Sequence, residues 1–247
     1  MQMKFDEALN VLRLTGIPQP KEELDEIVAS VHIERSGLVD PLFTRRYRLP
    51  VFLAITVGMF CQLSGINAIL YYLNDIFALA GASKVSGDLQ AVAVGAANLV
   101  ATLLAMSVID KIGRKKLLLF GTMGLAVSLS VVSYIFFTHR HLEWLVWLLM
   151  IYIAFFAVSQ GAVVWVYISE IFPTRVRSKG QSLGSSSHWI TNALISLVFP
   201  LMAVSSGAYP FMFFAAMMVI DFFLVLFYYP ETSNVSLEHL QTSLAID

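Results

Sequence analysis

Side chains that can hydrogen-bond a neutral ligand interrupt the apolar stretches of this sequence. They are amides, an imidazole and indole rings, and they come from four separate stretches: Gln62, Asn67, Asn98, Trp165, His188, Trp189 and Asn192. An amide offers two N–H donors and a carbonyl acceptor, which match neighbouring hydroxyl groups without burying a charge. An indole adds a flat apolar face and one N–H donor, which suit the C–H face of a sugar ring. The combination favours a small neutral polyol as the ligand.

Polar side chains inside apolar stretches also have a purely structural explanation. Hydrogen bonds between membrane helices are worth about 0.6–2 kcal/mol each, so any single amide could serve packing alone. Four stretches that all contribute neutral polar or aromatic groups favour a shared, watered cavity instead. An ion pathway would require carboxylates or arginines there, and the stretches hold only Asp221 at mid-length. We expect the Asp221 carboxyl to point into the bundle, neutral or locally hydrogen-bonded, with a proton relay as the alternative.

The composition requires a membrane environment for the elements that carry these residues. The 247 residues are 57% hydrophobic and 13% charged, with a mean hydropathy of +0.73. A soluble fold of this size cannot keep so much apolar surface from water, which excludes ordinary soluble enzymes and disordered proteins. The net charge of −1 carries no sign of a nucleic-acid partner. The sequence therefore predicts a multi-pass membrane protein.

Six apolar stretches approach the length of about 20 residues that a helix needs to cross a bilayer. We predict spans at Val51–Leu73, Leu89–Ile109, Leu117–Phe137, Trp144–Ile168, Gln181–Val204 and Pro210–Tyr229. The predicted domains are a cytoplasmic segment (1–47) with two short amphipathic helices broken at 16–20, the transmembrane domain (48–230) and a cytoplasmic tail (231–247). Segment 1–47 is interpreted as a linker, with a partner-docking arm as the alternative.

Basic residues predict the orientation. Ten Lys and Arg residues lie just before the first span or in the turns between spans two and three and spans four and five. The alternate loops carry only Lys84 and Arg140. Because cytoplasmic loops are enriched in Lys and Arg, both termini are predicted to be cytoplasmic in a cell membrane.

The spacing of Gln62 and Asn67 predicts a break in the first span. On an unbroken helix they lie roughly 140° apart, so both can face one cavity only if the helix unwinds. We expect this at Ser64–Gly65, and a similar interruption at Ser159–Gly161 in the fourth span. With the spans read as two triplets, the breaks fall in the first helix of each triplet. Paired breaks in inverted repeats are typical of a transporter site at the bilayer midplane.

Four ordered motifs resemble those in the carboxy-terminal half of sugar porters of the major facilitator superfamily. They are Gln62–Asn67 (QLSGIN) with Tyr71 and Tyr72, Asp110–Lys115 (DKIGRK), Trp165 with Ser169–Arg177 (SEIFPTRVR), and Pro230–Thr232 (PET). The resemblance covers essentially the whole chain. It implies an all-α membrane fold of six transmembrane helices in two inverted three-helix repeats, preceded by short cytoplasmic helices, which is half of a major facilitator fold.

The resemblance also implies roles for individual residues. Hydrogen bonds to sugar hydroxyls would come from Gln62, Asn67, Asn98 and Trp165. The cavity would be lined further by Phe156, His188, Trp189 and Asn192, and closed on its outer side by Tyr71 and Tyr72. A cytoplasmic ion-pair network that locks one access state would comprise Asp110, Arg114, Glu170 and Arg177. Without the resemblance, these charged residues are interpreted as solvated loop residues that set the membrane topology.

Three departures from the family pattern accompany the resemblance. Cys61 stands where the family usually has a second glutamine, which leaves the identity of the sugar open. Ala162 and Val164 stand where prolines are usual near Trp165, so the fourth span is expected to bend differently. The third departure is that the amino-terminal six-helix half has no counterpart here. We expect a fragment, or a half that meets a second chain or a second copy of itself.

The expected function is transport of a monosaccharide, a hexose or a pentose, by alternating access. The alternatives are a non-transporting sugar sensor, a regulatory half-porter or an inactive fragment. An enzyme is not expected, because the sequence carries no nucleophile–base pair and no phosphate-binding glycine loop. No cofactor or metal is expected either: Cys61 is the single cysteine, and His139 and His141 have poor spacing for a metal site.

Overall fold

The computed structural model describes residues 5–14, 19–22, 24–25, 28, 41–81, 84–233, 235 and 244. Within the helix that begins at Lys84, the side chains of residues 84–87, 106, 108 and 110 lie outside that description. Every regular element in the described part of the chain is helical, which confirms the all-α prediction. Of the two amphipathic helices predicted near the amino terminus, the first is α1 (Phe5–Leu14), and the second lies mostly outside the described residues.

The remaining elements form six apolar helical segments that are long enough to cross a membrane. The first comprises the short turn η1 (Arg45–Tyr47), α3 (Arg48–Leu63) and α4 (Ile66–Tyr71), and α5 (Leu73–Leu79) follows it. The second and third are α6 (Lys84–Ile112) and α7 (Arg114–Thr138). The fourth is η2 (Leu142–Trp144), α8 (Leu145–Phe156), the π-helical segment η3 (Ala157–Gly161) and α9 (Ala162–Glu170). The fifth and sixth are α10 (Arg177–Ser205) and α11 (Ala208–Tyr228).

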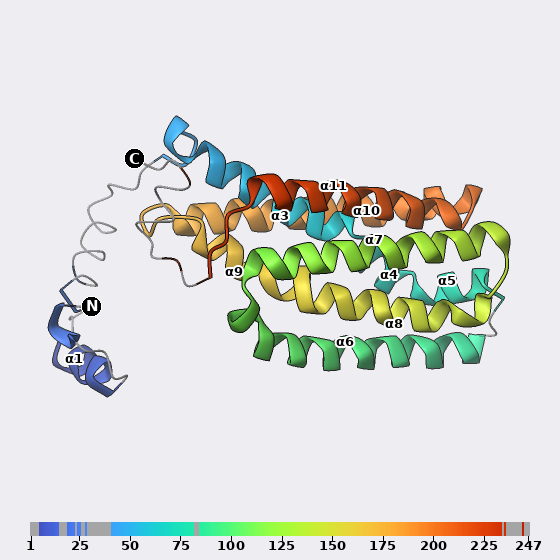
Figure 1. The fold of residues 1–247 in the computed structure, drawn as a ribbon, viewed down its shortest axis with the longest axis horizontal. Coiled ribbons are helices and arrows are strands. Elements are labelled where there is room, and N and C mark those ends of the chain that lie inside the picture. The colour runs from blue at the N-terminus through green and yellow to red at the C-terminus, as the bar shows by residue number, and fades with distance from the viewer. Residues whose placement is uncertain are drawn as a thin grey trace.

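All six predicted spans are confirmed within the described residues. Spans two to five extend a few residues beyond the predicted stretches at both ends, since backbone hydrogen bonding continues past the point where side chains become polar. The helices run side by side as a bundle (Figure 1), in which α11 packs along α7 and α3 along α10. The α8 helix packs against both α6 and α7. The fourth span therefore lies where its interruption can contact several neighbours.

The first span breaks at Ser64–Gly65, as predicted. Gly65 has φ +86°, a left-handed conformation that costs other residues about 1–2 kcal/mol, and a Cβ there would overlap the Phe214 ring. The Tyr152 hydroxyl of α8 donates to the Ser64 carbonyl at 2.9 Å. This bond satisfies a carbonyl that the break exposes at membrane depth. A second interruption, at Tyr72 between α4 and α5, was not predicted.

The fourth span is also interrupted where predicted, but by a different kind of irregularity. Its backbone stays helical and widens into the π-helical turn Ala157–Gly161. This bulge presses Ser159 against α7, where Gly121 makes room for it, because a Cβ at Gly121 would overlap the Ser159 side chain. A π-bulge adds one residue to a turn without stopping the helix, and such bulges occur often at functional sites.

Replacing Gly121 by alanine should therefore destabilise the chain. Because the added methyl group must displace Ser159 or α7, we expect the free energy of unfolding to fall by about 1–3 kcal/mol. The measurement is chemical unfolding of the purified protein. The matched control is Gly95→Ala in α6, where a Cβ meets no atom within 4 Å. That control should be neutral or slightly stabilising, and equal effects of the two substitutions would contradict the packing argument.

Candidate functional site

The break at Gly65 brings Gln62 and Asn67 into hydrogen-bonding contact. The Asn67 amide Nδ2 donates to Gln62 Oε1 at 3.2 Å. Gln62 Nε2 lies 2.7 Å from Nε2 of His188 on α10. Since the amide nitrogen can only donate, His188 Nε2 accepts, which leaves the imidazole proton on Nδ1. Three of the predicted residues thus form one connected polar group between α3, α4 and α10.

Two indole rings flank this group. The centroid of the His188 ring lies 4.8 Å from that of Trp165 and 5.1 Å from that of Trp189. Gln62 and His188 are 2% and 6% exposed, whereas the two tryptophans are 43% and 54% exposed. The polar atoms are therefore set back behind apolar ring faces that stay accessible. This arrangement can hold a neutral ring by stacking and orient its hydroxyls with few polar contacts.

Asn192 lies one turn beyond His188 on α10. Its side chain is buried, and its Oδ1 accepts a hydrogen bond from Ser196 Oγ at 3.3 Å. Phe156 ends α8 next to the π-helical turn. Its side chain is half-buried and packs against buried hydrophobic residues of the bundle. Neither residue forms a hydrogen bond with Gln62, Asn67 or His188 in the described part of the chain, so their roles in lining the cavity stay predictions.

Asn98 stands apart from this group. It lies on α6, which packs against α8 and the π-helical turn. Its half-buried side chain forms no hydrogen bond with Gln62, Asn67 or His188 in the described part of the chain. Its backbone carbonyl accepts the Thr102 hydroxyl at 2.8 Å, which is ordinary helix geometry. The expected role of Asn98 in sugar binding therefore stays a prediction.

The two tyrosines predicted to close the outer side differ in their surroundings. Tyr72 donates from its hydroxyl to the Ser196 carbonyl at 3.2 Å, and its ring stacks on Phe199 at 5.1 Å between centroids. Tyr71 is 59% exposed. Tyr72 thus ties the end of α4 to α10, while the role of Tyr71 in closing the outer side stays a prediction.

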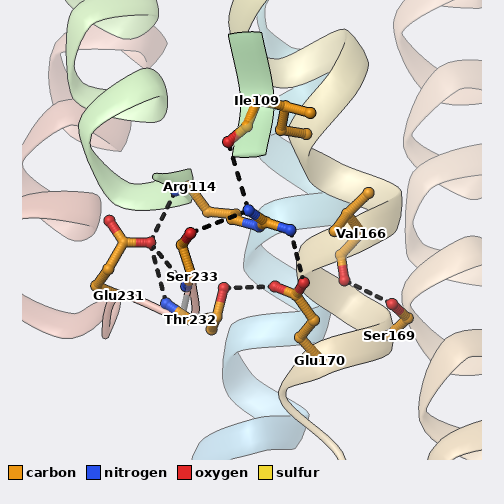
Figure 2. Close-up of polar contacts among 8 residues, drawn as sticks. All are labelled: Ile109, Arg114, Val166, Ser169, Glu170, Glu231, Thr232 and Ser233. Atoms are coloured by element: carbon orange, nitrogen blue, oxygen red, sulfur yellow. Dashed lines mark hydrogen bonds and ion pairs between the residues drawn. The ribbon is translucent and has the colours of Figure 1, made fainter. Parts of the chain in front are cut away.

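At the other end of the bundle, Arg114 and Glu170 form an ion pair. The distance from Arg114 Nη2 to Glu170 Oε1 is 2.9 Å, and Arg114 is 8% exposed (Figure 2). Arg114 Nη1 also reaches the Ile109 carbonyl and the Ser233 hydroxyl, and Thr232 Oγ1 donates to Glu170 Oε2 at 2.6 Å. The network joins the start of α7, the end of α9 and the segment after α11.

Glu231 completes this network, a role that the sequence analysis did not assign. Its Oε1 accepts the backbone N–H groups of Arg114, Thr232 and Ser233, and its Oε2 accepts that of Lys115. The carboxylate thereby caps the amino terminus of α7, where a negative charge is favoured. Gly113, at φ +97°, admits it, since a Cβ would lie 2.7 Å from Glu231 Oε2. The Pro230–Thr232 motif was the sequence signal for this contact.

The other two predicted members of the network are placed differently. Arg177 donates from Nε to the Phe172 carbonyl at 3.3 Å and forms no ion pair with Glu170 in the described part of the chain. The side chain of Asp110 lies outside the described residues. Their roles stay predictions. Among the residues that the structure describes, no cluster of three His, Cys, Asp or Glu side chains could hold a metal ion.

Comparison with known proteins matches nearly the whole chain to one family. A family model described as "Sugar (and other) transporter" matches residues 1–244. The arabinose-proton symporter of Bacillus subtilis (strain 168) is 34% identical over 241 residues, which cover 96% of this chain and 52% of the symporter. The galactose-proton symporter of Escherichia coli (strain K12) is 33% identical over 232 residues, which cover 92% and 50%. The chain thus spans about half the length of these relatives.

Solved structures agree with the sequence matches. A double-tryptophan mutant of XylE superposes with a TM-score of 0.83 at 29% identity, covering 98% of this chain and 52% of that one. The inward-open conformation of the xylose transporter XylE from E. coli gives a TM-score of 0.73 at 28% identity, covering 96% and 50%. The helices described above therefore have the arrangement of one half of a major facilitator transporter.

Proposed function

Because the chain belongs to the sugar transporter family, whose members are transporters and not enzymes, we propose that it supplies the carboxy-terminal six-helix half of a monosaccharide porter. One observation carries this proposal. Gln62, Asn67 and His188 form a connected polar group, set back between two half-exposed indole rings. The group is neutral, which fits an uncharged sugar. Residues 48–230 form the proposed transmembrane domain, from the start of α3 to two residues past the end of α11.

The proposed substrate is a hexose or a pentose. Similar proteins are named as arabinose-, galactose- and xylose-proton symporters. A similar structure, the proton:xylose symporter XylE, was solved with 6-bromo-6-deoxy-D-glucose bound. Cys61, adjacent to Gln62, is buried. Its thiol is a weak hydrogen-bonding group, so Gln62 and Asn67 carry the contacts to the hydroxyls.

The proposed partner is an amino-terminal six-helix half or a second copy of the chain. In the central parts of α6 and α10 only 17% of residues are buried, compared with 67% in the first span. The face of α10 around Trp189 exposes Leu194, Leu197 and Leu201. A second half packed on α6 and α10 would enclose the accessible indole faces, and alternating access requires two such halves.

We propose that the Arg114–Glu170 network acts as the cytoplasmic lock of that porter. It joins α7, α9 and the segment after α11 at one end of the bundle, where the basic loops predict the cytoplasm. Such a network contributes to switching only if its bonds form in one access state and open in the other. Both termini are accordingly proposed to be cytoplasmic.

Sugar uptake tests this proposal directly. Vesicles that contain the chain together with an amino-terminal half from a sugar-proton symporter should accumulate labelled xylose, arabinose or galactose. Vesicles with either half alone should not, because one half cannot alternate. Unlabelled sugar should compete for uptake, and an amino acid should not. Sugar binding without flux would indicate a sensor, and the absence of both in the assembled protein would contradict the proposal.

A further inference from the structure

Asp221 is a carboxylic acid buried within the bundle, on α11. It lies at the fourteenth of the 21 residues of that helix and is 2% exposed. No Lys, Arg or His side chain forms an ion pair with it in the described part of the chain. An ionised carboxylate in such a place loses its hydration without gaining a counter-charge, which costs several kcal/mol. The neutral, protonated acid avoids that cost.

The hydrogen bonds of Asp221 identify a position for the proton. Gln160 Nε2 donates to Asp221 Oδ2 at 2.6 Å and also approaches the Met218 sulfur at 3.7 Å. Gln160 Oε1 is buried and has no partner in the described part of the chain. A protonated carboxyl and a primary amide are complementary, since the acid O–H can donate to the amide oxygen while the amide N–H donates to the acid oxygen. One proton on Asp221 would therefore satisfy the unpaired Gln160 oxygen.

We propose that Asp221 is a proton-binding site and that its protonated carboxyl, paired with Gln160, holds the π-helical turn of the fourth span against α11. Gln160 lies within this turn, between Phe156 and Trp165. The turn is thus held on two sides, by the close contact of Ser159 with Gly121 on α7 and by the acid–amide pair on α11. Ionisation of Asp221 would remove one hydrogen bond of the pair and favour an open, hydrated arrangement of the turn.

The other ionisable groups around Asp221 leave this assignment intact. The Cys61 thiol of α3 and the Tyr229 phenol, just after α11, interact with it electrostatically, and neither can supply a positive charge. On α7 the charged residues lie in the first turn, where Lys115 Nζ donates to the Leu226 carbonyl. On α10 the ionisable side chains are Arg177, Lys179 and His188, of which His188 bonds to Gln62. None of these groups forms an ion pair with Asp221 in the described part of the chain.

Infrared spectroscopy of the purified chain in an ester-free detergent tests protonation. At neutral pH we expect a carbonyl band of a protonated carboxylic acid, which shifts on exchange into D₂O and is lost in Asp221→Asn. In Gln160→Leu the band should move to higher frequency, because its hydrogen bonds are gone. The matched control is Asp75→Asn, at an exposed residue of α5, which should leave the band unchanged. A chain without such a band, or a band that persists in Asp221→Asn, would overturn the proposal.

Hydrogen exchange of the backbone amides in the π-helical turn tests whether the Asp221–Gln160 pair holds this turn against α11. Asparagine can form an amide–amide pair with Gln160. In the Asp221→Asn variant, the backbone amides of residues 157–161 should therefore exchange at the same rate as in the unmodified chain. Asp221→Ala should exchange about tenfold faster there, as expected for the loss of a buried hydrogen bond. Gln160→Leu should show the same acceleration, which gives a second readout if Asp221→Ala does not fold. Unchanged exchange in both disrupting variants would refute the coupling. These measurements need no sugar and no second half, so they are independent of the proposed transport function.

Discussion

Replacing Arg114 by alanine is expected to lower the free energy of unfolding by about 3 kcal/mol, because it leaves a half-buried carboxylate without its counter-charge. The Arg114 guanidinium is the link between three segments. It pairs with Glu170 at 2.9 Å and reaches the Ile109 carbonyl and the Ser233 hydroxyl. Without it, Glu170 retains its described bond from Thr232 alone. The measurement is denaturant unfolding of the purified chain, followed by helical circular dichroism.

Two further variants separate the lost ion pair from a general effect of removing an arginine. Arg114→Lys keeps the positive charge but cannot reproduce the planar fork, so it should recover only part of the loss. Arg175→Ala removes an exposed arginine from the neighbouring loop and should change the stability by less than about 0.5 kcal/mol. If the Arg114→Ala and Arg175→Ala variants unfold at the same denaturant concentration, the network does not stabilise this end of the bundle.

The positions of the spans could be predicted from the sequence because bilayer thickness sets their length. The break at Gly65 could be predicted too, since no unbroken helix turns both Gln62 and Asn67 to one cavity. The form of the break in the fourth span could not be predicted. Whether Ser159–Gly161 unwinds or widens into a π-helical turn depends on the space that Gly121 provides on α7, 38 residues earlier in the chain.

The rotation of each helix about its axis was harder to predict. The α6 helix is apolar around its whole circumference, exposing Leu99 and Leu103 while burying Val94 and Ala101. Hydrophobic periodicity cannot say which face of such a helix turns inward. The sequence therefore indicated that Asn98 is unusual without showing which neighbours it meets. In contrast, His188 and Asn192 on α10 are both buried, as their four-residue spacing predicts.

Long-range polar contacts could not be predicted from the sequence. The pairing of Glu231 with the amino terminus of α7 joins residues 117 positions apart, and the Gln160–Asp221 bond joins residues 61 apart. Spacing along the chain carries no information on such pairs. The Pro230–Thr232 and Asp110–Lys115 motifs contain Glu231 and Gly113, but only the structure shows that Gly113 leaves room for the Glu231 carboxylate.

Replacing Gln62 by alanine is expected to weaken sugar binding about 100-fold in the assembled porter, equivalent to about 2.7 kcal/mol. Gln62 accepts from Asn67 and contacts His188, so its removal leaves the half-buried Asn67 and the buried His188 without their shared partner. The sugar loses its direct contact to Gln62, and a sugar hydroxyl left unpaired in the closed site costs about 1–3 kcal/mol. Titration of tryptophan fluorescence measures the affinity, because Trp165 and Trp189 flank the site.

The matched control is Gln181→Ala, at an exposed glutamine near the start of α10, which should bind sugar like the unmodified porter. Since Gln62 is buried, its variant must be titrated at a temperature where circular dichroism shows both proteins folded. A second variant, His188→Gln, keeps a side chain that can accept from Gln62 and should lose less affinity than Gln62→Ala. If Gln62→Ala folds and binds as tightly as Gln181→Ala, the polar group between α3, α4 and α10 is a packing feature, and the sugar must bind elsewhere.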